Sequence, residues 1–165
     1  MKQELTAARL RELLHYNPET GVFTWLVHRQ RYRAGMFAGS PHSIGYIEIG
    51  VCGRSYLAHR LAWLYVHGEW PKFDVDHKNG IKNDNRMENL RDVSKVANMQ
   101  NRRKATALNE SGLLGVSKSA AKSERWFSRI QVDGKQKQLG SFDSPEKAHE
   151  AYLAAKRALH EGCTI

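Results

Sequence analysis

Apolar residues near the N-terminus recur at helical spacing and then give way to short runs of strand-forming residues. Leu10, Leu13 and Leu14 fall on one side of a helix, which predicts a helix over residues 6–16. Turn-forming residues interrupt the pattern, and the β-branched and aromatic residues of 22–27 predict a strand. Three arginines with a period of two follow, which would place them on one face of an extended segment: Arg29, Arg31 and Arg33.

The middle of the chain predicts a hairpin, a helix and a second strand pair. Asn79-Gly80 is a strong turn signal between the strands of that second pair. Ser94 is a suitable N-cap for the helix that follows them. In chain order, we expect strands over 46–49 and 54–57, a helix over 59–67, strands over 75–77 and 90–93, and a helix from Ser94 to about residue 104.

The last third of the chain predicts a separate small domain. Residues 101–111 are polar and basic, so we expect them to link a first domain, residues 1–100, to a second, residues 112–165. The second domain should hold strands over 115–117, 126–132 and 136–139, and then a helix from Ser144 to about residue 161. The predicted class is α+β, and the second domain is a three-stranded antiparallel sheet packed on one helix.

The charge of the chain narrows the class of partner. Lys and Arg number 26 against 17 Asp and Glu, which gives a formal net charge of +9. Residues 1–100 carry 14 basic and 10 acidic side chains, whereas residues 101–165 carry 12 and 7, so the excess is denser toward the C-terminus. Such an excess attracts polyanions, and nucleic acid is the most common one inside a cell. The competing explanation for the positive charge is that it only keeps the protein soluble.

The sequence also excludes several classes of protein. No apolar run approaches the length of a membrane-spanning helix, and the N-terminus lacks the apolar core of a signal peptide. We therefore expect a cytoplasmic protein without a membrane partner. Cys52 and Cys163 lie far apart without CxxC spacing, so we expect free thiols rather than a disulfide framework or a four-cysteine zinc site.

Residues 76–98 concentrate groups that are suited to phosphate chemistry. Asp76 falls on a predicted strand and Asn98 in the first turn of the next predicted helix, so their oxygen atoms can converge on one cation. Hard oxygen ligands suit magnesium, and two of them suit a cation that is shared with a substrate phosphate. His77 adds a base. Adjacent strand residues point to opposite faces, so Asp76 and His77 can share a pocket only if the strand ends or bulges at His77.

The segment VDHKNGIKNDNRMENLRDVSKVANMQN resembles the ββα-metal motif of HNH homing endonucleases of phage and intron type. The resemblance is carried by Asp76-His77, Asn85-Arg86, Asn89-Leu90 and Asn98, and the preceding LAHRLAW resembles the short helix that leads into the motif. It implies that Asp76 and Asn98 hold a divalent metal and that His77 is the general base. It also implies that Asn89 holds the loop so that the histidine is correctly oriented.

Two features differ from many HNH proteins. The third letter of the motif is Asn98 rather than histidine, as in the HNN subgroup, which favours magnesium or manganese over zinc. The cysteine pairs that bind structural zinc are absent from the sequence, so no structural zinc is expected. His59 is explained either as a structural histidine or as a phosphate contact. The asparagines at 79, 83 and 85 are explained as loop formers.

Residues 112–161 resemble the plant ethylene-response-factor (apetala-two) type of DNA-binding domain. The resemblance is carried by GVSKS, RWFSRIQV, KQKQLGSF and SPEKAHEAYLAAKRAL. It implies the same three-stranded sheet and helix that the residue pattern predicts. The family's string of arginines is thinner here, because Ser117 and several glutamines occupy matching positions.

Strand alternation sorts the residues of this domain by face. Trp126, Ser128 and Ile130 would face the helix. The opposite face would read base edges, or it is no more than a solvated surface, and it carries Phe127, Arg129, Gln131, Gln136 and Gln138. Phosphate contacts are expected from Lys118, Lys122, Arg125, Lys135, Lys137, Arg102 and Arg103. For Arg29, Arg31 and Arg33, phosphate contact and a solvated basic edge are equally good explanations.

These features together predict a site-specific, metal-dependent endonuclease that hydrolyses phosphodiester bonds in double-stranded DNA. The single set of Asp76, His77 and Asn98, without any heptad run, predicts a monomer that nicks one strand. The alternative is a sequence-specific DNA-binding regulator with a vestigial nuclease site. The joint presence of the metal, base and loop residues argues against that alternative, because binding alone does not need them.

Overall fold

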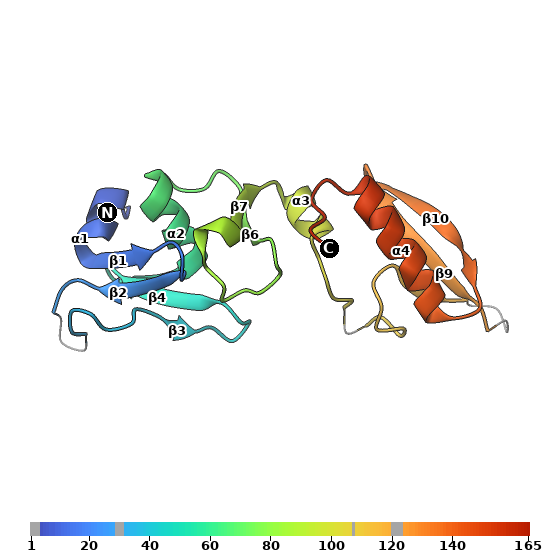
Figure 1. Cartoon of the computed structure of the whole chain (residues 1–165), viewed down its shortest axis with the longest axis horizontal. Coiled ribbons are helices and arrows are strands. Elements are labelled where there is room, and N and C mark those ends of the chain that lie inside the picture. The colour runs from blue at the N-terminus through green and yellow to red at the C-terminus, as the bar shows by residue number, and fades with distance from the viewer. Residues whose placement is uncertain (1–3, 29–31, 107, 120–123) are drawn as a thin grey trace. The chain divides into compact units, whose positions relative to one another are not determined.

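The computed structural model describes residues 4–28, 32–106, 108–119 and 124–165 (Figure 1). The chain combines helices with small antiparallel sheets, as in the α+β class. It divides into two compact units, residues 1–94 and 95–165. Among the described residues, no helix is both long enough and apolar enough to cross a membrane.

The first unit combines two helices with short antiparallel strand pairs. In chain order the elements are α1 (Ala7–Leu13), β1 (Leu14–Asn17), β2 (Val22–Trp25), β3 (Ser40–Pro41), β4 (Ile47–Val51), β5 (Arg54–Leu57), α2 (Ala58–His67), β6 (Asp74–His77), the 3-10 turn η1 (Met87–Asn89) and β7 (Leu90–Val93). Strand β1 pairs with β2, β4 pairs with β3 and β5, and β6 pairs with β7.

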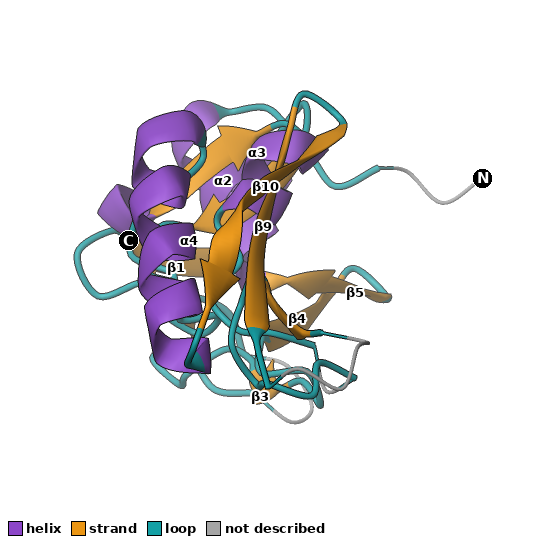
Figure 2. Ribbon diagram, turned by 90° about the vertical axis from the view of Figure 1, so that its right-hand side faces the viewer, coloured by secondary structure: helices purple, strands orange, loops and turns teal. Residues whose placement is uncertain are grey.

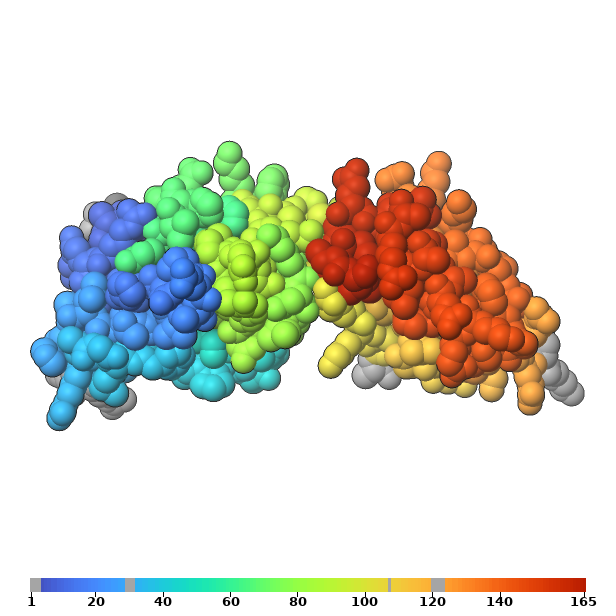
Figure 3. Space-filling view, viewed as in Figure 1, coloured from blue at the N-terminus to red at the C-terminus, as the bar shows by residue number. Residues whose placement is uncertain are grey.

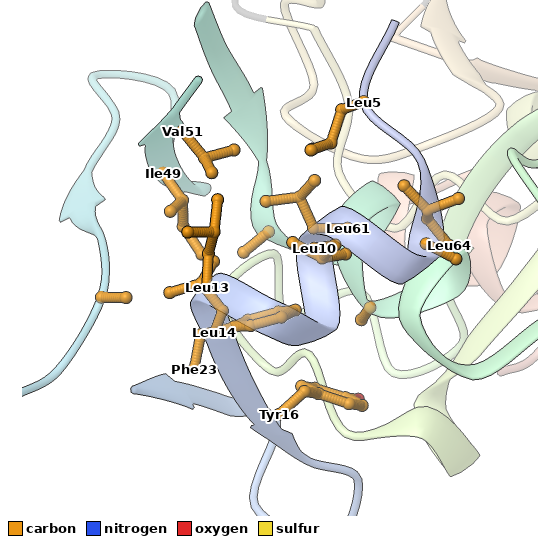
Figure 4. Packing of buried hydrophobic residues seen from close by; sticks show 14 of the residues in the cluster. Leu5, Leu10, Leu13, Leu14, Tyr16, Phe23, Ile49, Val51, Leu61 and Leu64 are labelled. Atoms are coloured by element: carbon orange, nitrogen blue, oxygen red, sulfur yellow. The ribbon is translucent and has the colours of Figure 1, made fainter. Parts of the chain in front are cut away.

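An apolar core holds these elements together (Figure 4). Leu10, Leu14 and Leu61 are completely buried, and Phe23 and Ile49 are nearly so. Burial of one such side chain contributes about 1.5–3 kcal/mol. Two-stranded pairs are only marginally stable in water, so the shared core is what keeps β1–β2 and β6–β7 folded.

The N-terminal helix is shorter than the residue pattern predicts. The hydroxyl of Thr6 caps α1 by accepting a hydrogen bond from Arg9 N at 3.2 Å, and the helix ends at Leu13 rather than at residue 16. Leu14 instead begins β1 and pairs with Trp25. The leucine pattern misled the prediction because a leucine at the start of a core-facing strand is buried as well as one in a helix. Tyr16 is therefore a strand residue.

The other helices and strands that the sequence predicts for the first unit are present among the described residues. The β4–β5 hairpin turns at Cys52 and Gly53, whose positive φ values of 52° and 71° suit a tight hairpin turn. Cys52 is exposed there. The carbonyl of Arg33 accepts from Met36 N at 3.1 Å, at the start of a turn. Arg29 and Arg31 lie outside the described residues.

The second unit contains a three-stranded antiparallel sheet with β9 (Trp126–Val132) in the centre. Helix α4 (Pro145–Leu159) packs against all three strands (Figures 1 and 2). The α4 N-terminus is as predicted, with Ser144 Oγ accepting from Lys147 N at 3.3 Å and Pro145 in the first turn. The elements are α3 (Lys95–Gln100), β8 (Val116–Lys118), β9 (Trp126–Val132), β10 (Lys135–Phe142) and α4 (Pro145–Leu159).

Helix α3 is tied to the C-terminal residues of this unit. Gly162 N donates to Gln100 Oε1 at 3.0 Å, and Thr164 Oγ1 donates to Asn101 Oδ1. A Cβ on Gly162 would lie 2.2 Å from the Ala97 carbonyl oxygen, so the tail fits closely against α3. In Figure 3 the dark red C-terminal residues accordingly lie against the yellow segment that follows residue 100. The helix ends at Gln100, four residues earlier than the sequence pattern predicts.

A buried lysine strengthens the same attachment. Lys156 of α4 is 1% exposed, and its ammonium donates to the carbonyl oxygen of Arg102. Burial lowers the pKa of Lys156 below its usual value. These contacts join α3 and residues 101–111 to the second unit, which begins at Lys95. The sequence pattern instead predicts α3 as part of a first domain and residues 101–111 as a linker.

This attachment can be tested with two fragments of the second unit. Residues 95–165 should melt about 5–10 °C higher than residues 112–165, because only the longer fragment supplies the Arg102 carbonyl that Lys156 needs. An unsatisfied buried polar group costs about 1–3 kcal/mol, and each kcal/mol shifts the Tm of so small a domain by about 4–8 °C. Thermal melts followed by circular dichroism measure the difference. Equal melting temperatures would contradict the structural role of this contact.

Candidate active site

The candidate catalytic residues lie on the strand pair β6–β7 and on the loop that joins the two strands. Val75, Asp76 and His77 are all buried, so β6 is covered on both of its faces. Asp76 lies opposite Arg91, and His77 lies opposite Leu90. The strand ends at His77, whose carbonyl accepts from Gly80 N at 2.9 Å as the chain turns.

Asn89 closes the loop between the two strands. Its Oδ1 accepts from Asn79 N at 3.0 Å, and its Nδ2 donates to the Asp84 carbonyl at 2.7 Å. The Asp84 carboxylate in turn accepts from Asn79 Nδ2 at 2.6 Å and from the Arg86 guanidinium at 2.8 and 2.9 Å. The Arg86 guanidinium is also the main reason why the pKa of Asp84 falls to about 2. Hydrogen bonds from side chains therefore fix the loop near both of its ends.

The imidazole of His77 is held by a residue that the sequence pattern explains only as a loop former. Asn85 is 3% exposed, and its Oδ1 lies 3.1 Å from His77 Nε2. An amide oxygen is only an acceptor, so Nε2 carries the proton and Nδ1 carries the lone pair. Burial lowers the pKa of His77, and the hydrogen bond to Asn85 opposes part of that effect. The resemblance pointed to Asn85-Arg86, but spacing could not pair Asn85 with His77.

Two further rings surround His77. The His59 ring on α2 lies edge-on to it, with centroids 5.0 Å apart, and the Tyr46 ring lies 5.9 Å from it. Tyr46 and His59 are themselves 5.0 Å apart. His59 is 5% exposed, and its buried Nδ1 has no hydrogen-bond partner among the described residues. Burial is the main cause that lowers the pKa of His59 to about 3, and the nearby His77 is the second cause. His59 is thus a neutral packing residue beside the candidate base.

Asp76 faces a different partner. Its Oδ2 accepts from Arg91 Nε at 3.0 Å and from Nη2 at 2.8 Å across the strand pair. The pair is largely buried, with 10% of the Asp76 side chain and 20% of the Arg91 side chain exposed. The sequence pattern does not reveal Arg91, because only the register of β6 and β7 places it opposite Asp76. The two hydrogen bonds from the guanidinium fix the orientation of the carboxylate.

The second predicted metal ligand, Asn98, lies on α3, which belongs to the second unit. Its side chain offers an amide oxygen, and Asp76 offers a carboxylate, which are the donors that a hard divalent cation prefers. Within the part of the chain that the structure describes, no cluster of three or more His, Cys, Asp or Glu residues is placed to hold a metal. The oxygen donors of Asp76 and Asn98 fit a hard divalent cation by their chemistry.

A polar face on the second unit matches the alternation that the sequence predicts. Ser128 and Ile130 are buried, whereas Arg129 and Gln131 are exposed on the other side of β9. Gln138 pairs with Arg129, and Gln136 pairs with Gln131, so the four side chains share one face. The Arg129 guanidinium lies 5.6 Å from the centroid of the Phe127 ring on that face.

The remaining residues with predicted DNA contacts are mostly exposed. Arg125 donates to Ser141 Oγ at 2.7 Å and to the Ser141 carbonyl at 2.9 Å. Arg103 donates to the Thr164 carbonyl at 2.9 Å. Lys122 lies outside the described residues. Solvent reaches Arg33, Arg102, Lys118, Lys135 and Lys137.

Comparison with known proteins bears on the first of these sites. No curated protein and no solved structure matches the chain significantly. A family model described as HNH endonuclease does match, over residues 56–100. The match begins at the end of β5 and covers α2, β6, β7 and α3, with Asp76, His77, Asn85, Asn89 and Asn98. Residues 56–100 are therefore similar to HNH endonucleases, which supports a nuclease that acts on DNA.

Proposed function

We propose that the protein is a divalent-metal-dependent HNH endonuclease of the homing type, which hydrolyses a phosphodiester bond in double-stranded DNA. The observation that carries the proposal is the buried His77 imidazole, held by Asn85 on the strand pair β6–β7 within the matched segment. A buried neutral imidazole beside a fixed carboxylate is suited to general-base catalysis. The matched segment contributes the remaining residues of the motif.

In the proposed reaction His77 is the base. Because Asn85 accepts from Nε2, the Nδ1 lone pair takes a proton from the attacking water. The water oxygen bonds to phosphorus, and the bond from phosphorus to the leaving sugar oxygen breaks. Asn89 keeps the ring in place by closing the loop through Asn79 and Asp84. The low pKa of His77 leaves the ring neutral, and so able to accept a proton, at neutral pH.

Asp76 and Asn98 would hold the divalent cation, magnesium or manganese. Such a cation, when bound, stabilises the negative charge that develops on the scissile phosphate. The chain's own contribution is the orientation of the ligands. Arg91 fixes the Asp76 carboxylate across the strand pair, and the C-terminal tail holds the helix that carries Asn98.

The sheet of the second unit would select the DNA site. Arginine and glutamine side chains can make paired hydrogen bonds to base edges in the major groove. The face that carries Arg129, Gln131, Gln136 and Gln138 offers four such groups on adjacent strands. The resemblance to the ethylene-response-factor type of domain supports this use of the sheet.

Two substitutions in the second unit separate base reading from phosphate binding. Arg129→Ala should relax the sequence preference and weaken specific binding by about 1–3 kcal/mol, because it removes a base contact. Lys135→Ala should weaken binding to all sequences equally. It should also reduce the slope of the logarithm of the binding constant against the logarithm of the salt concentration by about one. Binding titrations on target and random duplexes at several salt concentrations measure both effects. Identical behaviour of the two variants would show that this face does not read bases.

The proposal is tested by incubating the purified chain with plasmid or phage DNA, with magnesium and with EDTA. Magnesium-dependent cleavage at a defined site is the expected result. The alternative function, a DNA-binding regulator with a vestigial nuclease site, predicts sequence-specific binding without cleavage under either condition. Absence of both cleavage and binding would exclude both functions.

A single base and a single pair of metal ligands predict the form of the product. Supercoiled plasmid that contains the target should first become nicked circles, because one centre hydrolyses one strand in each binding event. Linear DNA should appear late or only at high enzyme concentration, and the protein should sediment as a monomer. Agarose gels over time and analytical ultracentrifugation measure these outcomes. Early linear DNA together with a dimer mass would contradict nicking by a monomer.

A further inference from the structure

The turn of the N-terminal hairpin lies outside the segment that resembles HNH endonucleases, yet it contacts the loop that holds His77. We use the name hairpin turn for residues 16–21, which include the last two residues of β1, and this segment makes two hydrogen bonds to that loop. Tyr16 Oη donates to the Asn85 carbonyl at 2.6 Å, and Met87 N donates to the Pro18 carbonyl at 2.9 Å. Figure 3 shows the blue N-terminal residues beside the yellow-green residues of the loop. The hairpin turn therefore holds the backbone on both sides of residue 86.

A glycine completes this contact. Gly21 has φ +72°, and a Cβ at this position would lie 2.5 Å from both Arg86 N and the Asn85 carbonyl carbon. Backbone atoms cannot yield to a side chain as flexible side-chain ends can, so the close approach requires glycine. The turn itself is well fixed, because Asn17 Oδ1 accepts from Glu19 N at 2.9 Å and from Thr20 N at 3.1 Å.

The contact continues directly to the candidate base. The hairpin turn holds the main chain of Asn85, and the side chain of the same residue accepts the hydrogen bond from His77 Nε2 at 3.1 Å. Tyr16, Asn85 and His77 are all at least 95% buried. Because none of these three residues is exposed to solvent, a displacement of the hairpin turn also displaces the imidazole of His77.

We propose that the hairpin turn is a positioning element for His77. Tyr16 and Gly21 fix the main chain of Asn85, whose amide oxygen then selects the Nε2-protonated form of the histidine. The catalytic consequence rests on the proposed function, in which His77 is the base, whereas the effect on the protonated form does not. The nuclease therefore depends for catalysis, and not only for folding, on residues 16–21.

The test compares two glycine substitutions that strain the backbone equally. Gly53, in the β4–β5 turn, has φ +71°, and a Cβ added there would meet nothing within 4 Å, so Gly53→Ala is the matched control for Gly21→Ala. In the full chain, Gly21→Ala should lower the cleavage rate at saturating DNA by about tenfold or more, because small displacements of a catalytic group are costly. DNA affinity should stay within about twofold of native, and Gly53→Ala should cleave at close to the native rate. Equal cleavage by the two variants would overturn the proposal.

A second readout does not depend on cleavage. Nitrogen-15 chemical shifts of the histidine side chains, recorded without metal, report which ring nitrogen of His77 carries the proton. The native chain and Gly53→Ala should show Nε2 protonated, and Gly21→Ala should show a mixture of the two forms. A native signal in Gly21→Ala would also overturn the proposal. If the native chain cleaves no DNA, the proposed function fails, and these spectra still decide the positioning.

A milder substitution serves if Gly21→Ala does not fold. Tyr16→Phe removes only the hydroxyl that donates to Asn85 and keeps the buried ring. It should lower the cleavage rate severalfold and shift His77 partly from the Nε2-protonated tautomer to the Nδ1-protonated tautomer. Native cleavage together with native spectra in Tyr16→Phe would remove Tyr16 from the positioning element.

Discussion

Replacement of His77 by alanine should lower the rate of DNA cleavage by about a hundredfold or more, the usual scale for loss of a general base. Asp76→Ala and Asn98→Ala should cause losses of similar size, because each removes a proposed ligand of the cation. Binding of the same DNA in calcium or EDTA should change much less. Single-turnover cleavage and binding titrations on the same duplex measure the two effects separately.

Asp76 needs a further control, because its loss also leaves the buried Arg91 guanidinium without its carboxylate. Asp76→Asn keeps the shape of the side chain, and a thermal melt shows whether the unit still folds. Full cleavage by His77→Ala would refute the assignment of the base. Strong loss of DNA binding in all three variants would instead indicate a structural role for the segment.

The first unit should lose stability steeply in acid because of His59. The pKa of His59 is about 3 in the folded chain against an ordinary value of 6.5, so only the unfolded chain binds a proton between these values. The stability from the neutral ring is complete above pH 6.5 and is lost as the pH falls toward 3. The loss is on the order of 4–5 kcal/mol, which approaches the total stability of a small domain.

Urea unfolding between pH 3 and 7, followed by tryptophan fluorescence, measures this dependence. His59→Phe should flatten much of it, because a phenyl ring fills a similar space and does not bind a proton. His15, which is exposed on β1, provides the control, and His15→Gln should keep the native pH dependence. An unchanged pH dependence in His59→Phe would show that the buried ring is not its origin.

The sequence predicted most elements correctly where local chemistry decides them. The β6–β7 pair follows from a strand pattern and an Asn-Gly turn, and α4 follows from Ser144, Pro145 and an alanine-rich face. The predicted secondary structure is wrong where a residue fits a helix and a strand equally well. Leu14, for example, fits a helix and a core-facing strand. The bond between Asn101 and Thr164 joins residues 63 positions apart, so the polar composition of residues 101–111 does not reveal it.

The same distinction applies to the site. The sequence is enough to propose Asp76, His77, Asn89 and Asn98, because the motif keeps them close in the chain. It does not reveal the residues that contact them, since Arg91 depends on strand register and Tyr16 lies 69 positions from Asn85. Asn85 was visible in the motif, but its bond to His77 depends on the path of the loop. Periodicity and spacing carry no information about such pairings.

The attachment of α3 to the C-terminal tail bears on where chimeric enzymes could be joined. An exchange of the proposed DNA-binding sheet at a junction within residues 101–111 would leave α3 with the first unit, and it would separate α3 from its partners at Gly162 and Thr164. A junction between Ser94 and Lys95 keeps those contacts intact. The transferred unit would then carry Asn98, a proposed metal ligand, together with the proposed DNA-binding sheet, so that each recipient enzyme receives both from the same source.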